Sequence, residues 1–155
     1  MSTSLLYHGW GIRGYQYVRT SYVGGRAIFT VKPDAFSVTC PVCGSHDVLQ
    51  HGSIHRLWRE VPIGPKPVVV QMGIPRVECR KCATIRQIGV GFADERRSYT
   101  RGFARYALEL SRHMTILDVA RHLNVGWDLI KEIQKSYLQK HFSRGGIGDV
   151  PCFII

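Results

Sequence analysis

Four of the five cysteines occur as two C-x-x-C pairs, a spacing typical of metal-binding knuckles. The first pair is Cys40 and Cys43, the second is Cys79 and Cys82, and 35 residues separate the pairs. Two such knuckles at the tips of β-hairpins surround one ion with four thiolates, and tetrahedral sulfur coordination suits Zn²⁺. We therefore predict one zinc ion bound by these four cysteines. Because all four ligands would be protein atoms, the zinc has a structural role.

Three other interpretations of the cysteines stay open at this stage. A rubredoxin-like site would hold iron, and a single C-x-x-C pair can act as a redox dithiol. One of the histidines between the knuckles, His46, His51 or His55, would replace a cysteine in a site of three cysteines and one histidine. Cys152 lies beyond both knuckles and is interpreted as a spare thiol.

Residues 116–135, ILDVARHLNVGWDLIKEIQK, have the spacing of a helix-turn-helix. Ala120 is small where two helices must approach closely, and Asn124 stands where the turn needs a left-handed conformation. Ile130 and Ile133 would then face inward from the second helix. A generic small helical bundle is the alternative, and the positive charge of the chain favours the DNA-binding interpretation.

The outward face of that second helix carries side chains suited to nucleic acid. Lys131 and Lys135 are one turn apart and can reach guanine edges or phosphates. Trp127 either packs against a neighbouring helix or faces a groove, and Arg96 and Arg97 either follow the backbone or are solvated. The predicted DNA-contacting residues are Arg101, Arg105, Arg121, His122, Trp127, Lys131 and Lys135.

Composition supports a polyanionic partner. The 155 residues include 21 Lys+Arg and 11 Asp+Glu, which gives a formal net charge of +10. The excess is spread over the segments expected to fold, as in nucleic-acid-binding proteins, although basic charge also simply favours solubility. No apolar run approaches the roughly 18 residues of a membrane helix, and residues 1–6 lack the features of a secretory signal. We expect a soluble intracellular protein without disulfides.

Two kinds of element must position these residues. Residues 15–31 predict two strands around Gly24 and Gly25, because paired glycines between β-rich runs indicate a hairpin. Further short strands are expected over Ile54–Val61, Pro67–Gln71 and Ile74–Cys79.

After Asp94 the periodicity becomes helical. We predict helices beginning after Thr100, at Thr115 or Asp118, and at Trp127, the last ending near Phe142. The expected fold class is α+β, with an N-terminal β-hairpin and a β-rich zinc ribbon followed by a three-helix helix-turn-helix domain. The predicted boundaries are 1–34 for the hairpin extension, 35–94 for the zinc ribbon, 95–144 for the helix-turn-helix domain and 145–155 for a tail.

The order of these motifs resembles the N-terminal half of bacterial insertion-sequence transposases of the ISL3 family. The resemblance covers about residues 35–144 and is carried by CPVCGS, HGSIHRLWREVPIG, VECRKC and DVARHLNV. It implies a zinc ribbon and a helix-turn-helix that recognise the terminal inverted repeats of the element as duplex DNA. It also implies a bacterial cytoplasmic protein associated with the nucleoid. Homodimerisation is left open, and no membrane partner is expected.

Family members continue into an RNase H-like domain with a DDE carboxylate triad, which performs strand cleavage and transfer. Here the sequence departs from that pattern over residues 143–155, and Asp149 does not match a catalytic carboxylate. Two-metal phosphoryl transfer needs several converging carboxylates, so we assign no catalytic residue and expect a truncated or frameshifted, non-enzymatic chain. The alternative function is a zinc-stabilised transcriptional regulator or protein-interaction module.

Overall fold

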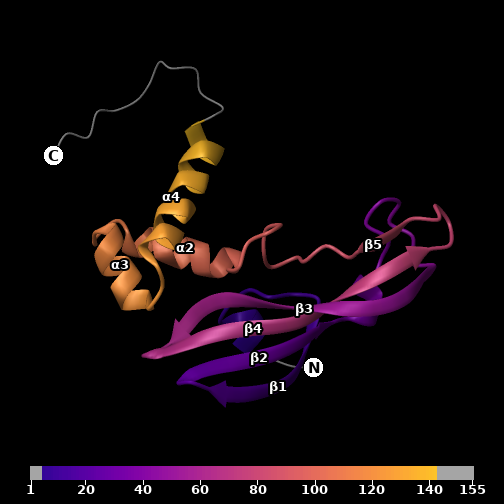
Figure 1. Cartoon of the computed structure of the whole chain (residues 1–155), viewed down its shortest axis with the longest axis horizontal. Helices are drawn as coiled ribbons and strands as arrows, with labels where there is room; N and C mark the ends of the chain where they lie inside the picture. Colours follow the sequence, from indigo (N-terminus) through magenta and orange to yellow (C-terminus); the bar gives the residue numbers. More distant parts are fainter. Residues whose placement is uncertain (1–4, 143–155) are drawn as a thin grey trace. The chain divides into compact units, whose positions relative to one another are not determined.

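The computed structural model describes residues 5–142 and divides the chain after Ala104 into two compact units (Figure 1). The first unit holds the β-sheet, and the second holds α3 (Ile116–Leu123), α4 (Trp127–Phe142) and the end of α2 (Arg101–Leu110). The α+β class is therefore observed. Cys152 and Asp149, which the sequence singled out, lie outside the described residues.

The predicted N-terminal hairpin is confirmed. It consists of β1 (Tyr15–Val23) and β2 (Arg26–Pro33), which pair antiparallel. Gly24 and Gly25 connect them with φ values of 56° and 74°. Positive φ at both central residues gives a two-residue turn the twist of the flanking strands, and glycine adopts it without a steric penalty.

The strands that follow are longer than expected. β3 (Val48–Ile63) extends the predicted Ile54–Val61 at both ends, and β4 (Lys66–Cys79) joins two segments that were predicted as separate strands. Met72 and Gly73 join the two segments, and Pro75 is part of the same strand although proline cannot donate to a β ladder. The register of β3 against β4 shifts between Gln50 and Ser53, next to this proline, and prolines are tolerated at such bulges.

One sheet contains all the strands found between residues 5 and 142, in the order β1-β2-β4-β3, with β5 (Ile85–Gln87) also paired to β4. The β2–β4 pair is parallel, and the other pairs are antiparallel. Residues Ala27–Val31 lie beside Val68–Met72, so the hairpin shares a sheet with the strands that carry the second knuckle.

The core of the first unit lies along β4. Val68, Val70, Met72 and Val77 of this strand have no exposed surface, which agrees with the buried-strand pattern of the sequence. Trp58 of β3 packs edge-on against a phenylalanine at position 92, with ring centroids 5.1 Å apart. Leu6 of α1 (Leu5–His8) and Val38, which follows the short helix η1 (Ala35–Ser37), also belong to this core.

The helical boundaries agree with the predicted caps. Thr100 Oγ1 accepts a hydrogen bond from the backbone N–H of Phe103 at 3.0 Å, and Thr115 does the same for Asp118 at 3.2 Å. Each bond satisfies a backbone donor that the first turn of a helix leaves unpaired. Among residues 105–142, the buried ones are Ala107, Val119, Ala120, Leu123, Ile130 and Ile133.

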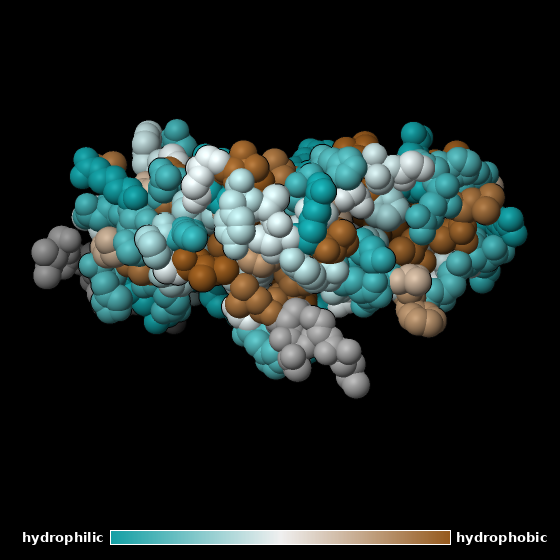
Figure 2. Space-filling model, turned by 90° about the horizontal axis from the view of Figure 1, so that it is seen from below, coloured by the Kyte–Doolittle hydropathy of each residue, from teal (hydrophilic) through white to brown (hydrophobic). Residues whose placement is uncertain are grey.

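The surface mixes polar and apolar side chains. Figure 2 shows hydrophobic and hydrophilic residues interspersed on the face that it presents. Phe36 and Tyr22 are the most exposed of the described large hydrophobic residues, at 88% and 70%. Between residues 5 and 142, no helix has the length and hydrophobicity needed to cross a membrane.

Candidate metal centre and nucleic-acid interface

The first knuckle follows η1 and turns sharply at Cys40–Cys43. Gly44 has a φ of 70°, and its backbone N–H donates to the Cys40 carbonyl at 2.9 Å. The Cys40 N–H donates to the Ser45 carbonyl at 2.9 Å, which closes the loop. A left-handed glycine directly after the second cysteine allows the chain to fold both thiols toward one point.

The second knuckle lies between β4 and β5. Cys79 is the last residue of β4, and its N–H donates to the Thr84 carbonyl at 3.0 Å across the turn. Ala83 in this turn has a φ of 52°, a left-handed conformation that is uncommon for a residue with a side chain. The antiparallel β4–β5 pair thus holds the second knuckle at its tip, as a zinc-ribbon knuckle requires.

All four sulfur atoms lie within 4.8 Å of one another. Cys40 Sγ is 3.6 Å from Cys82 Sγ, and Cys43 Sγ is 3.5 Å from Cys79 Sγ. Tetrahedral zinc–thiolate bonds of about 2.3 Å require S···S separations of about 3.8 Å. The distances and the soft donor set fit Zn²⁺, and the four cysteines predicted to bind one metal ion are placed to do so.

Local hydrogen bonds favour the thiolate form of two of the four cysteines, Cys40 and Cys82, whereas the pKa of Cys43 is raised to about 11: the Ser45 backbone N–H lowers it, but the neighbouring Cys79 thiol and burial raise it more. The backbone N–H groups of Cys43 and Val42 lower the pKa of Cys40, and Val42 N lies 3.4 Å from the Cys40 sulfur. The Thr84 side chain, with its oxygen 3.4 Å from the sulfur, lowers the pKa of Cys82 to about 6. Hydrogen-bonded thiolates are better ligands than isolated thiols because less free energy is needed to deprotonate them.

The histidine alternative receives no support from the geometry. His51 Nε2 lies 2.6 Å from a carboxylate oxygen of Glu78, on the neighbouring strand. Within the described part of the chain, cysteines alone form the group of potential ligands around the site. This arrangement favours a site of four cysteines over one in which a histidine replaces a cysteine.

The turn between α3 and α4 has the predicted left-handed residue. Asn124 has φ 51° and ψ 56°, and its N–H donates to the carbonyls of Ala120 and Arg121. Val125 N–H also donates to the Ala120 carbonyl, at 3.0 Å. Ala120 is 3% exposed, as expected for a small residue at a close approach of helices.

Helix α4 buries two isoleucines and exposes two lysines in its first half. Ile130 and Ile133 are buried, as predicted, whereas Lys131 and Lys135 are exposed. Trp127 is 51% exposed, and the Lys131 ammonium lies 5.3 Å from the centre of its ring. About half of the indole is therefore open to solvent beside a lysine, and a contact between Trp127 and a DNA groove stays a prediction.

The other predicted DNA contacts differ in their surroundings. Arg121 and His122 are exposed on α3, and Arg105 is exposed on α2. Arg101 instead binds Asp94 at 2.7 Å and donates to the Gly91 carbonyl at 3.1 Å. A DNA contact by Arg101 stays a prediction, and it would compete with these internal partners.

A buried carboxyl was not singled out from the sequence. Glu60 on β3 has no exposed surface, and its Oε1 accepts a hydrogen bond from the Val61 N–H at 2.8 Å. Burial raises the pKa of Glu60 to about 7, although hydrogen bonds from Val61 and Thr100 lower it. A Cβ at Gly102 would lie 3.1 Å from Glu60 Oε1, so a small residue at the start of α2 accommodates the carboxyl.

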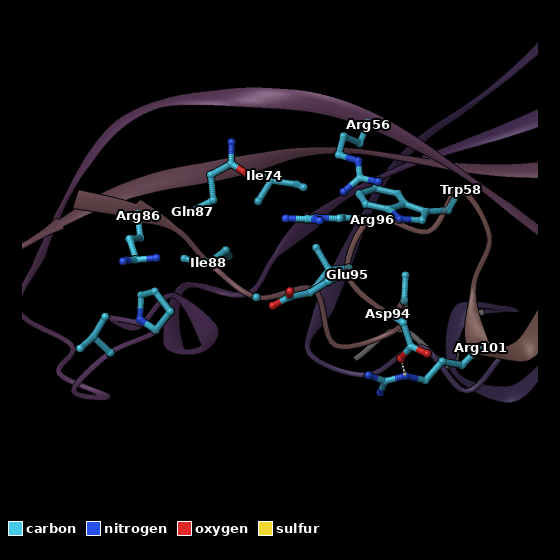
Figure 3. Close-up of a pocket in the computed structure, with 15 residues that line it drawn as sticks. Arg56, Trp58, Ile74, Arg86, Gln87, Ile88, Asp94, Glu95, Arg96 and Arg101 are labelled. Carbon is cyan, nitrogen blue, oxygen red and sulfur yellow. Dashed lines mark hydrogen bonds and ion pairs between the residues drawn. The ribbon is translucent and has the colours of Figure 1, made fainter. Parts of the chain in front are cut away.

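The second feature that sequence reasoning missed is a cavity of about 710 Å³ in the first unit (Figure 3). Arg56, Arg86 and Arg96 contribute to its lining from three segments that are distant in sequence. No sequence motif unites these arginines, since only the folding of the sheet and the loop after β5 brings them to one cavity.

A four-cysteine cluster on a β-rich unit, followed by a helix–turn–helix segment, defines a zinc-finger and helix-turn-helix protein. Residues 37–82 match the family described as the zinc-finger of transposase IS204/IS1001/IS1096/IS1165. Residues 90–138 match the helix-turn-helix domain of transposase family ISL3. The chain therefore carries the zinc-finger and helix-turn-helix domains of ISL3-family transposases.

One curated relative is the "Transposase for insertion sequence element IS1001" of Bordetella parapertussis. It is 26% identical over 132 residues, which make up 84% of this chain and 32% of the relative. The chain thus spans about a third of the length of this relative. No solved structure matches the chain.

Proposed function

We propose that the chain binds duplex DNA and serves as the part of an insertion-sequence transposase that recognises the ends of the element. The observation that carries this proposal is the two-sided character of α4. Ile130 and Ile133 are buried, while Trp127, Lys131 and Lys135 are exposed beside the left-handed turn. Such a helix, after a tight turn, is typical of a recognition helix.

In this proposal α2, α3 and α4 form a three-helix helix-turn-helix domain, with α4 lying in the major groove. Residues near the start of a recognition helix reach base edges, which assigns Trp127 and Lys131 to the bases or to the nearest phosphates. Arg105, Arg121 and His122 would contact the backbone and fix the register of the helix.

The metal centre supports binding by maintaining the fold. Bound zinc would link the two knuckles and so fix β4 relative to the loop after η1, and Cys40, Cys43, Cys79 and Cys82 would hold it. We assign the zinc ribbon to residues 35–94 and the helix-turn-helix to residues 95–144, and the two would share recognition of the terminal inverted repeats. DNA binding in the bacterial cytoplasm, in association with the nucleoid, is the proposed activity, and strand cleavage is not assigned to these domains.

A salt titration of DNA binding tests the proposal. The logarithm of affinity should fall linearly with the logarithm of salt concentration, with a slope of about 0.9 for each neutralised phosphate. Lys131→Ala and Lys135→Ala should each weaken binding, whereas Lys32→Ala, at an exposed lysine on β2, should not. Undetectable binding to a pool of duplexes that includes element ends would refute the proposal.

A protein-interaction module or transcriptional regulator is the second candidate, and exposed hydrophobic residues favour it. Tyr137 and Leu138 on α4 are 42% and 52% exposed. With Leu108 they line an open cavity of about 300 Å³ within the second unit. Binding of a protein partner together with indifference to DNA would favour this function, and sedimentation of the purified chain would show whether the partner is a second copy.

A further inference from the structure

The cavity in the first unit is bordered by the first zinc knuckle, by β5 and the loop after it, and by the loop over residues 93–96. Its floor includes Trp58 of β3 and Ile74 of β4. We name the cavity the arginine groove, after Arg56, Arg86 and Arg96. In the view of Figure 3, Arg56 and Arg96 lie toward Trp58, Arg86 lies toward the opposite end, and Glu95 projects between them.

The arginines of the groove differ in how firmly they are held. Arg56 donates from Nη2 to the Arg97 carbonyl at 3.0 Å, and its guanidinium lies 5.3 Å from the centre of the Trp58 ring. Arg86 and Arg96 are exposed, and neither side chain has a hydrogen bond or ion pair among residues 5–142. The groove therefore offers one anchored guanidinium and two with their donors available.

The backbone at Arg96 adds a second observation. Arg96 has a φ of 61°, a conformation that a residue with a long side chain seldom adopts, within a turn where Arg97 N–H donates to the Asp94 carbonyl at 3.3 Å. Glycine or asparagine would adopt it at lower cost. An arginine here presents its charge to the groove at a site where local conformation alone would select another residue.

The charge balance of the groove favours an anion. Asp94 neutralises Arg101 through the 2.7 Å ion pair, which leaves Arg56, Arg86 and Arg96 against the single carboxylate of Glu95. Guanidinium groups bind phosphate oxygens through paired N–H donors, and they do so more specifically than an ammonium group.

The groove lacks what a base-stacking site requires. Trp58 is the aromatic residue in its lining, it is only 1% exposed, and Arg56 lies over its ring. Proteins that bind single strands stack bases on exposed aromatic rings. A surface with guanidinium groups and no available aromatic face is suited to the phosphates of a duplex, whose bases remain stacked on one another.

We propose that the arginine groove binds the phosphodiester backbone of duplex DNA and gives the first compact unit its own sequence-independent contact. This inference rests on the proposed DNA-binding function and extends it to residues outside the three helices. Arg86 and Arg96 would bind phosphate oxygens, Arg56 would support them electrostatically, and Glu95 would oppose them.

The test measures binding of the full-length zinc-loaded chain to a duplex of element-end sequence and to a scrambled duplex, over a range of salt concentrations. Arg86→Gln and Arg96→Gln should each weaken binding roughly tenfold at 0.1 M salt and reduce the salt slope by about 0.9. The loss should be equal for both duplexes, because phosphate contacts carry no sequence information. Glu95→Gln should tighten binding to both duplexes.

Control variants separate charge from folding. Arg19→Gln removes an exposed arginine of β1 that does not line the groove, and it should leave affinity and salt slope unchanged. Arg86→Lys and Arg96→Lys keep the charge and should retain most of the salt slope. Zinc content and thermal melting are measured on every variant, so that unfolding is not mistaken for loss of a contact.

The outcomes distinguish this inference from the function on which it rests. If wild-type chain binds DNA and Lys131→Ala weakens it, but the glutamine variants bind as wild type with an unchanged slope, the groove proposal is wrong and the proposed function stands. If the groove binds inorganic phosphate or single-stranded RNA but the glutamine variants do not change duplex affinity, the groove proposal is likewise wrong. If wild-type chain binds no DNA, both are wrong.

Discussion

Asn124 shows how one residue fixes the geometry between two helices. Its left-handed conformation, with φ 51°, costs a residue with a branched side chain about 1–2 kcal/mol, and costs asparagine or glycine less. We expect Asn124→Val to lower the free energy of unfolding by about 1 kcal/mol or more, and Asn124→Gly to preserve it. Urea denaturation followed by circular dichroism measures both. Gln139→Val, at an exposed position within α4, is the control for the added branched side chain, and equal effects at 124 and 139 would contradict the explanation.

Glu60 makes the stability of the first unit depend on pH. Burial raises the pKa of its carboxyl from 4.5 to about 7, although hydrogen bonds from Val61 and Thr100 oppose the shift. The folded state then holds the proton more tightly than the unfolded state does. The free energy of unfolding must therefore fall as pH rises from about 4.5 to about 7, by at most about 3 kcal/mol, and it levels off above that range.

Glu60→Gln removes this titration while keeping an oxygen that can accept from Val61 N–H. As pH rises from 5 to 7.5, wild type should lose unfolding free energy that the variant keeps. The variant should therefore become more stable relative to wild type over this range. Comparing the two proteins at each pH cancels the separate effect of pH on metal binding by the cysteines. A difference that stays constant across this range would show that the carboxyl does not titrate there.

At the scale of elements, the zinc ribbon depends on both knuckles. Cys79 is fully buried at the end of β4 and is one of the four sulfur atoms within 4.8 Å of one another. We expect Cys79→Ser to reduce zinc content from one ion per chain to none and to destabilise the first unit by several kcal/mol, because structural zinc contributes directly to folding.

Elemental analysis and thermal melting check the effect of Cys79→Ser. Cys152→Ser, at the thiol predicted to be spare, is the matched control and should retain one zinc. Iron in place of zinc, with visible absorption, would instead support the rubredoxin-like interpretation.

The elements also show which parts of the fold can be predicted. The hairpin at Gly24 and Gly25 and the left-handed Asn124 were predictable because local conformation selects these residue types. The knuckles were predictable because metal coordination fixes cysteine spacing. The parallel pairing of Ala27–Val31 with Val68–Met72 depends on packing between distant segments, which one sequence does not reveal.

The candidate sites also divide into those that a local sequence pattern predicts and those that only the folded chain brings together. Lys131 and Lys135 were predictable from helical periodicity, since they share one face of α4 away from the buried isoleucines. The arginine groove was not predictable, because Arg56, Arg86 and Arg96 have no regular spacing and meet only in the folded sheet and its loops. Glu60 resembled an ordinary exposed glutamate in a strand until the residues packed around it were known.

At the scale of the whole molecule, zinc changes the charge available for DNA. Four thiolates and one Zn²⁺ carry about −2 together, so the formal charge of +10 becomes about +8 in the zinc-bound protein. The remaining excess occurs in both compact units, which include the arginine groove in one and the α4 lysines in the other. Long-range attraction to DNA is therefore a property of the entire chain rather than of the helices alone.

This distribution predicts that the two surfaces contribute independently to affinity. We compare Lys131→Ala, Arg96→Gln and the double variant on the same duplex at several salt concentrations. Because the two residues belong to different units, their effects on binding free energy should add to within about 0.5 kcal/mol. The salt slope of the double variant should fall by about 1.8, since two phosphate contacts are lost. A coupling energy well above 0.5 kcal/mol would contradict independence and would mean that loss of one contact removes the other.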